Sequence, residues 1–221
     1  MKNCNTSENN ETTRGVLSKV CATALAVAFT LSVAQVASAH QITPPRAPGD
    51  IDVPPGNKPF LVGHGVGTQN YICLPAGAGF AFTLFTPEAT LFSHGQQVIT
   101  HYFSPNNNPF DPADKGVIRV TWEDPRDTSI VCGAVEKSSS DANFVAPGAI
   151  PWLKVKAVGA QDGPTGGDRL SGTTFIQRVN TVGGSAPSTG CAALGDVGKK
   201  AFVPYTADYF FYFDPYADDR R

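Results

Sequence analysis

The sequence predicts an all-β, single-domain fold, a β-sandwich or a jelly-roll-like barrel of roughly nine or ten short strands with little helix. Gly and Pro account for 22 and 18 of the 221 residues, and they interrupt the chain too often for long helices. Short runs rich in β-branched and aromatic residues lie between these interruptions. The apolar fraction of 41% is sufficient for one globular core.

Several of these runs alternate apolar and polar side chains, which is the pattern of a half-buried strand. The run GVIRVTW places Ile118, Val120 and Trp122 on one face and Val117, Arg119 and Thr121 on the other. By the same reasoning, strands are expected at residues 63–73, 80–85, 89–92, 97–103, 116–122, 129–135, 153–157, 173–182 and 207–213.

The N-terminal residues 1–39 have the features of a signal peptide. Basic residues precede an apolar run, and a small-x-small site ends at Ala39. The alternative is an uncleaved anchor over residues 20–39, which are almost long enough to cross a bilayer. Cleavage after Ala39 predicts a secreted or periplasmic protein that has no membrane contact once the signal is removed.

Three segments follow the signal peptide. Residues 40–58 contain many prolines and are expected to form an extended, mobile leader outside the core. Residues 59–213 form the β domain, and residues 214–221 form a charged C-terminal tail. The formal net charge of −2 and the absence of a basic cluster argue against nucleic acid as a partner.

Three cysteines remain after cleavage of the signal, namely Cys73, Cys132 and Cys191. An oxidising compartment favours one disulfide, and the sequence alone permits three pairings. The positions beside strand ends favour Cys73 with Cys191. Cys132 lies inside a β-like run and is expected to be an inert buried thiol.

Four ordered blocks resemble a known family. They are GTQNYIC at 67–73, APGAIPWL at 146–153, TFIQRVNT at 174–181 with the following Gly-Gly pair, and VPYTADYFFY at 203–212. The chain is similar through residues 59–212 to the DUF3455 family of exported proteins. This resemblance implies no activity, because none is established for the family. It supports the pairing of Cys73 with Cys191, since cysteines stand at both places in the family's blocks.

The candidate ligand-binding residues are Trp122, Gln177, Arg178 and Asn180. Alternation places Arg178 and Asn180 on one face of their strand and Gln177 on the other. These polar groups can belong to a structural network or to a pocket, and Trp122 can be a carbohydrate platform or core packing. The expected partner is a small molecule, a carbohydrate or a surface component. A binding or structural role is therefore favoured over catalysis.

An alternative function is copper-dependent catalysis. Cleavage after Ala39 would make His40 the mature N-terminus, where its α-amino and ring nitrogens can chelate copper. This feature resembles the histidine brace of lytic polysaccharide monooxygenases, with His101 as a partner and His64 or His94 as other choices. Other enzyme motifs are missing from the sequence, because GAG at 77–79 lacks the third glycine of a dinucleotide fingerprint and no G-x-S-x-G occurs.

Overall fold

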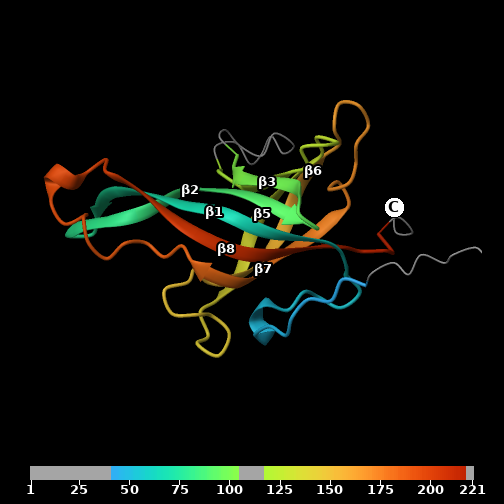
Figure 1. The fold of residues 1–221 in the computed structure, drawn as a ribbon, viewed down its shortest axis with the longest axis horizontal. Helices are drawn as coiled ribbons and strands as arrows, with labels where there is room; N and C mark the ends of the chain where they lie inside the picture. The colour runs from blue at the N-terminus through green and yellow to red at the C-terminus, as the bar shows by residue number, and fades with distance from the viewer. Residues whose placement is uncertain (1–40, 105–116, 218–221) are drawn as a thin grey trace, which may run out of the picture. The chain divides into compact units, whose positions relative to one another are not determined.

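The computed structural model describes residues 41–104 and 117–217, in which eight strands form one closed antiparallel barrel (Figure 1). Each strand pairs with its neighbours in the sequence, and β8 closes the barrel by pairing with β1. The strands are β1 (Lys58–Ala76), β2 (Gly79–Ser93), β3 (Gln96–Phe103), β4 (Val120–Glu123), β5 (Ile130–Ser139), β6 (Trp152–Gln161), β7 (Thr173–Gly183) and β8 (Lys200–Phe213), with short 3₁₀ turns η1 (Gly49–Ile51) and η3 (Leu194–Asp196).

The prediction of an all-β, single-domain fold is confirmed, but the strands form neither a sandwich nor a jelly roll. A jelly roll requires strands that cross between two sheets, whereas here the order in the sheet is the order in the sequence. The strands expected at 80–85 and 89–92 are one continuous strand, β2, which runs through Pro87. This merger brings the number of strands in the described residues to eight.

Alternate residues of the strands fill the barrel interior. In β8, Tyr205, Ala207, Tyr209 and Phe211 point into this core, and all four are at most 3% exposed. The large ring of Tyr209 fits because β1 carries a glycine, Gly65, next to the ring. A Cβ atom added to Gly65 would lie 2.8 Å from Cε2 of Tyr209. The barrel therefore depends on a small residue in β1 to admit a large aromatic residue from β8.

The Pro-rich leader packs on the outer face of the barrel instead of remaining free. Residues 41–57 contain no strand, but Ile51 is fully buried in a second apolar cluster with Trp152, Val179 and Phe210. The main-chain oxygen of Ile51 accepts a hydrogen bond of 3.0 Å from Nε2 of Gln177. The leader is therefore not separate from the folded domain, because apolar residues among the prolines bury their side chains on β6, β7 and β8.

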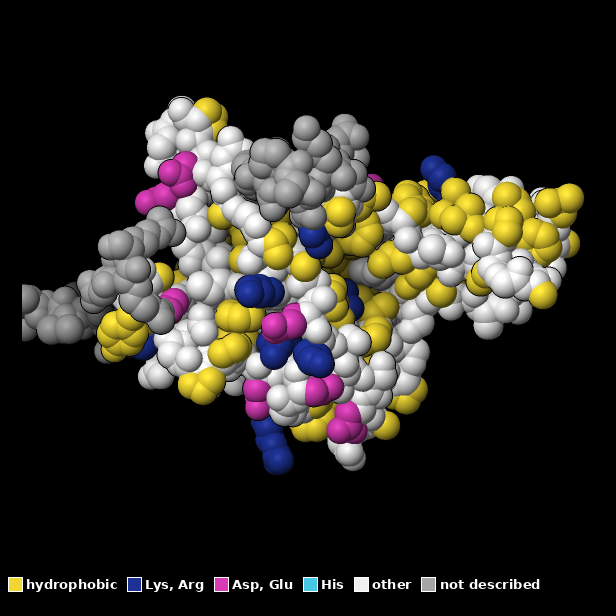
Figure 2. All heavy atoms as spheres, turned by 180° about the vertical axis from the view of Figure 1, so that it is seen from behind, with side chains coloured by type: hydrophobic (Ala, Val, Ile, Leu, Met, Phe, Trp, Pro, Cys, Tyr) yellow, Lys and Arg dark blue, Asp and Glu magenta, His cyan; other side chains and the backbone are white. Residues whose placement is uncertain are grey.

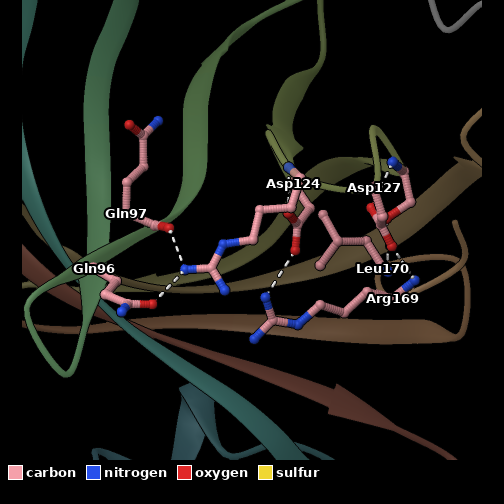
Figure 3. Close-up of polar contacts among 8 residues, drawn as sticks. Gln96, Gln97, Asp124, Asp127, Arg169 and Leu170 are labelled. Atoms are coloured by element: carbon pink, nitrogen blue, oxygen red, sulfur yellow. Dashed lines mark hydrogen bonds and ion pairs between the residues drawn. The ribbon is translucent and has the colours of Figure 1, made fainter.

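One end of the barrel is closed by the loop between β6 and β7. Leu170 of this loop is fully buried in the interior core, and its main-chain nitrogen donates to Ser129 Oγ over 3.1 Å. Arg169 and Asp124 form an ion pair of 2.8 Å in the same region (Figure 3). Gly163 packs so closely that an added Cβ atom would lie 1.9 Å from the Asp127 oxygen.

Asp127 ties the turn after β4 to this loop. Its Oδ1 accepts from the nitrogen and hydroxyl of Ser129 at 2.8 and 2.6 Å, and its Oδ2 accepts from the Arg169 nitrogen at 2.9 Å. Burial disfavours the charged carboxylate, but these hydrogen bonds outweigh it and lower the pKa of Asp127. Every charged group in this network that Figure 3 labels has a partner, so this end of the barrel is a structural closure.

The disulfide joins Cys73 of β1 to Cys191 in the connection between β7 and β8, which confirms that pairing. It lies where β1, β2 and β8 extend together beyond the other strands (Figure 1). Cys132 is free and buried, as predicted, and burial raises the pKa of its thiol. A thiol with a raised pKa is a poor nucleophile at neutral pH.

The predicted signal peptide, His40 and residues 218–221 of the predicted tail lie outside the described residues. Within the described part of the chain, no helix is long and apolar enough to cross a bilayer.

Candidate ligand-binding cavity

A cavity of about 200 Å³ lies inside the barrel at the end opposite Leu170. All eight strands contribute lining residues, and the lining contains aromatic and aliphatic side chains with one cation, Arg178. Val135 and Leu84 belong to the lining and are 51% and 38% exposed, so they mark the mouth of the cavity. The face shown in Figure 2 is hollowed beside the β1–β2 hairpin, and hydrophobic atoms surround the hollow.

Arg178 of β7 is the charged residue of the cavity, and it is only 9% exposed. Its Nη2 donates to the main-chain oxygen of Pro151 over 2.8 Å. Nε has no hydrogen-bond partner among the described residues, and no described carboxylate forms an ion pair with the guanidinium. A buried cation without a counter-ion is costly, so this site is electrostatically incomplete.

Two other cavity residues carry unsatisfied donors. Nε1 of Trp122, which is 1% exposed, has no hydrogen-bond partner in the described structure. Nε2 of Gln69, which is 2% exposed, also lacks a partner of good geometry, although the Gln69 side chain lies near enough to the Tyr205 hydroxyl to lower the pKa of that tyrosine against the effect of burial. Buried polar groups in proteins are almost always hydrogen-bonded, so unpartnered donors need an explanation. Together with Nε of Arg178, they are three buried N–H groups of cavity-lining residues that lack a partner of good geometry in the described structure.

His101 of β3 is a buried neutral residue in the cavity wall. Its ring stacks on Trp122, with centroids 4.6 Å apart and an interplanar angle of 9°. Burial lowers the pKa of His101 to about 3, and the positive charge of Arg178 contributes to the lowering against a hydrogen bond to the Thr121 oxygen. Nδ1 lies 2.8 Å from that oxygen and therefore carries the proton, which leaves Nε2 as an acceptor.

Tyrosines complete the polar part of the site. The Tyr71 hydroxyl donates to the main-chain oxygen of Gly184 over 2.6 Å, and the Tyr205 and Tyr209 hydroxyls lie 2.9 Å apart. Burial raises the pKa of Tyr71 and of Tyr209 against the opposing effect of the Arg178 charge, and hydrogen bonds from Tyr205 and Arg178 also lower the pKa of Tyr209. The tyrosines are therefore neutral at physiological pH and cannot neutralise Arg178.

The structure brings together two of the four predicted ligand-binding residues. Trp122 and Arg178 line the cavity. Trp122 is 1% exposed, so it offers no surface platform to a carbohydrate. Gln177 lies on the outer face, as its alternation predicts, where it accepts a hydrogen bond of 2.9 Å from the Tyr212 hydroxyl and donates to the leader.

Asn180 does not share the face of Arg178, contrary to the predicted alternation. The register of β7 against β8 shifts between Val179 and Val182, and Asn180 has a positive φ of 52°. This bulge turns the side chain outward, where Nδ2 donates to Asp208 Oδ2 over 2.8 Å. A bulge changes the two-residue period locally, and the sequence pattern does not reveal it.

The copper hypothesis names His40, which lies outside the described residues, and His101, which lies in the barrel wall. No group of three or more His, Cys, Asp or Glu side chains suitable for a metal occurs within residues 41–104 and 117–217. His64 is on the outer surface, with Nδ1 2.5 Å from Asp208 Oδ1.

Three cavity residues with polar side chains, namely Gln69, Tyr71 and Tyr209, were not among the sequence-based candidates. Gln69 and Tyr71 belong to the block GTQNYIC and alternate along β1, and Tyr209 belongs to the alternating series in β8. The alternation of polar or aromatic residues within these blocks was the sequence signal that could have identified them as cavity residues. Only the closure of β1 against β8 shows that both strands line one cavity.

These observations define a closed, eight-stranded antiparallel barrel that is plugged at one end and has an arginine-containing cavity at the other. The chain belongs to the family described as "Protein of unknown function (DUF3455)", whose model matches residues 54–213. The resemblance seen in the four sequence blocks is thereby confirmed. Searches of curated proteins and of solved structures found no match.

Proposed function

We propose that this protein is an exported binding module that takes a small ligand into the open end of its barrel. The observation that carries the proposal is the cavity of about 200 Å³, in which buried N–H donors of Gln69, Trp122 and Arg178 lack partners. Ligand sites are typically concave, largely apolar and supplied with a few convergent polar groups. This cavity has each of those properties.

Binding is favoured over acid–base catalysis by the ionisable groups of the cavity. A general base works best when its pKa is near the operating pH, whereas the pKa of His101 is about 3. The lining described for the cavity contains no Asp or Glu side chain. These groups are suited to holding a ligand by hydrogen bonds and charge.

The size of the cavity favours a small molecule over an oligosaccharide or a protein segment. A volume of 200 Å³ is below the range of roughly 300 to 1,000 Å³ for sites that hold drug-sized ligands. An apolar cavity of about 150 Å³ accommodates benzene. The proposed ligand therefore has about the size of one ring with a substituent.

Export is the second part of the proposal. It is supported by the signal-peptide features of residues 1–39 and by the disulfide between Cys73 and Cys191, because structural disulfides belong to oxidising compartments. The Cys132 thiol is buried, so it does not expose a reactive group there.

The binding proposal is tested by blocking the mouth of the cavity. Val135→Trp adds bulk at a partly exposed lining position, and Val182→Trp makes the same change at a position that is 60% exposed and outside the lining. A library of neutral and charged one-ring fragments is screened by NMR chemical-shift changes. We expect fragments to bind the wild-type protein and Val182→Trp, and to lose binding in Val135→Trp.

If no fragment binds, or if binding is unaffected by Val135→Trp, the proposed function is wrong. Thermal unfolding of both Trp variants provides the control for folding, since each change is made at a position more than half exposed.

A copper-dependent enzyme is a second candidate, and one observation favours it. Gln41, the residue after His40, lines a surface hollow of about 720 Å³ together with His64 and His94. If Ala39 is the last residue removed, a copper ion held by His40 would have imidazole ligands available near the leader. This candidate uses the outer surface and leaves the barrel cavity unused.

The copper candidate is tested on the mature protein. Intact-mass analysis must find His40 at the N-terminus, and copper titration must show uptake at micromolar metal. The uptake must fall in a His64→Ala, His94→Ala double variant. A different N-terminus, or copper uptake that the double variant retains, would eliminate this candidate.

A further inference from the structure

We infer that the barrel cavity selects a small monocarboxylate with an apolar body, and that the ligand carboxylate binds Arg178. This inference rests on the proposed binding function and specifies the chemical class of its ligand.

Arg178 places a positive charge in the interior of the barrel. A guanidinium is protonated at all physiological pH values, and transfer of a cation from water into a barrel interior is unfavourable without an anion. In most folds the counter-ion of a buried arginine is an Asp or Glu side chain. Arg169 at the closed end has such a counter-ion in Asp124. Arg178 instead contacts two neutral acceptors, the main-chain oxygen of Pro151 and the hydroxyl of Tyr209, which carry only partial charges.

The neighbouring groups strengthen the preference for an anion. The unpartnered N–H groups of Gln69 and Trp122 are donors, and a carboxylate accepts several hydrogen bonds through its two oxygens. His101 is neutral, so it does not add a second positive charge. One buried positive charge surrounded by neutral donors is matched by a ligand with a single negative charge.

The remaining wall is apolar, which determines the body of the ligand. Val155 and Ile176 are fully or almost fully buried, and both line the cavity beside Trp122 and Tyr209. A ring or a branched hydrocarbon placed against these side chains gains the free energy of apolar burial. A carboxylate alone would leave most of the 200 Å³ without contacts.

Benzoate is the probe for this inference, and benzamide and acetate are its matched controls. Benzamide keeps the ring and shape but has no charge, whereas acetate keeps the charge but has no ring. Isothermal titration calorimetry is carried out on the intact mature protein at pH 7. We expect benzoate to bind roughly tenfold or more tightly than benzamide, because hydrogen bonds to charged groups are the stronger ones. Acetate is expected to bind more weakly than benzoate.

Variants assign the preference to Arg178. Arg178→Met is expected to abolish the preference for benzoate over benzamide, and Arg178→Lys to retain part of it, because Lys keeps the charge without the planar fork. Gln69→Leu is expected to weaken benzoate binding by roughly three- to tenfold. Asn180→Ala, on the outer surface, is the control and should leave binding unchanged.

Each outcome is decisive. Equal affinity for benzoate and benzamide, or an unchanged preference in Arg178→Met, overturns the inference. If acetate binds as tightly as benzoate, the inference that the ligand has an apolar body is wrong. If Arg178→Met does not fold, the wild-type selectivity and Gln69→Leu decide the question. If neutral rings bind as tightly as benzoate and Val135→Trp blocks their binding, the proposed binding function holds and the inferred preference for a carboxylate is wrong.

Discussion

The two ends of the barrel each contain an arginine, but the two residues have opposite electrostatic environments. Arg169 at the closed end pairs with Asp124 over 2.8 Å, and the loop that carries it inserts Leu170 into the core. Arg178 at the open end is more deeply buried and has no carboxylate partner among the described residues. The closed end therefore satisfies its charges internally, whereas the open end leaves a charge and three N–H donors for a ligand.

This difference separates residues that hold the barrel together from residues that are available for function. A satisfied ion pair at the closed end contributes to stability, because removal of one partner leaves the other as a buried charge without a counter-ion. An unsatisfied cation contributes little or unfavourably to stability, and the proposed binding function would account for its presence.

The disulfide should be the strongest stabiliser, and its effect should be concentrated on the open side of the barrel. The Cys73→Ala, Cys191→Ala double variant is expected to lose about 4 kcal/mol of unfolding free energy, since the bridged residues are 118 positions apart. Urea unfolding measures the loss. Hydrogen exchange should accelerate at the tip of the β1–β2 hairpin while the Leu170 amide stays protected. Equal acceleration at both places would contradict the distinction between the ends.

At the closed end, Arg169→Ala should lower the unfolding free energy by about 2 to 3 kcal/mol. The Asp124 carboxylate, whose side chain is 1% exposed, would lose its counter-ion. Arg126→Ala is the matched control, because Arg126 Nη2 contacts only Gln96 and the Gln97 oxygen in an exposed position. The control should cost less than about 1 kcal/mol in urea unfolding. Similar losses in both variants would show that the Arg169–Asp124 pair has no special role.

The open end should determine the stability change between pH 6.5 and pH 5. The pKa of His101 is about 3 in the folded protein and about 6.5 when unfolded, so acidification protonates the unfolded chain first. The folded state is then expected to lose about 2 kcal/mol by pH 5. The lowered pKa of Asp127 at the closed end acts mainly at lower pH, because this carboxyl titrates at about 4 in the unfolded chain and below that in the folded protein. His101→Gln should flatten the dependence, and exposed His94→Gln should leave it unchanged.

Arg178→Met should have the smallest effect on stability. Its expected change in unfolding free energy is below about 1 kcal/mol in either direction, because no carboxylate is left stranded and the desolvation cost of the cation disappears. Thermal and urea unfolding measure the change beside Arg169→Ala. A loss as large as that of Arg169→Ala would identify Arg178 as a structural residue and remove the contrast between the two ends.

Local patterns in the sequence were sufficient for several parts of this structure. Alternation predicted the strands and placed Gln177 on the opposite face from Arg178. The strand-end positions of Cys73 and Cys191 and the family blocks predicted the disulfide. These features depend on the two-residue period of a strand and on positions close in sequence, so they can be determined without knowledge of the fold.

The outward turn of Asn180 and the docking of Ile51 needed the structure. A bulge depends on how β7 and β8 pair, and the burial of Ile51 depends on an apolar surface that β6, β7 and β8 form only when folded. The proline content of the leader describes its local conformation and gives no information about what it packs against.

The sequence by itself thus determined an all-β domain, its family and its disulfide, because strand period and block order are local properties of the chain. Tertiary structure decided that β1 pairs with β8 to close one barrel, and that closure places Gln69, His101, Trp122 and Arg178 around a single cavity. It also decided that Arg169 meets a carboxylate, whereas Arg178 meets none among the described residues. Which charges meet depends on contacts between residues far apart in the sequence, and no local pattern encodes them.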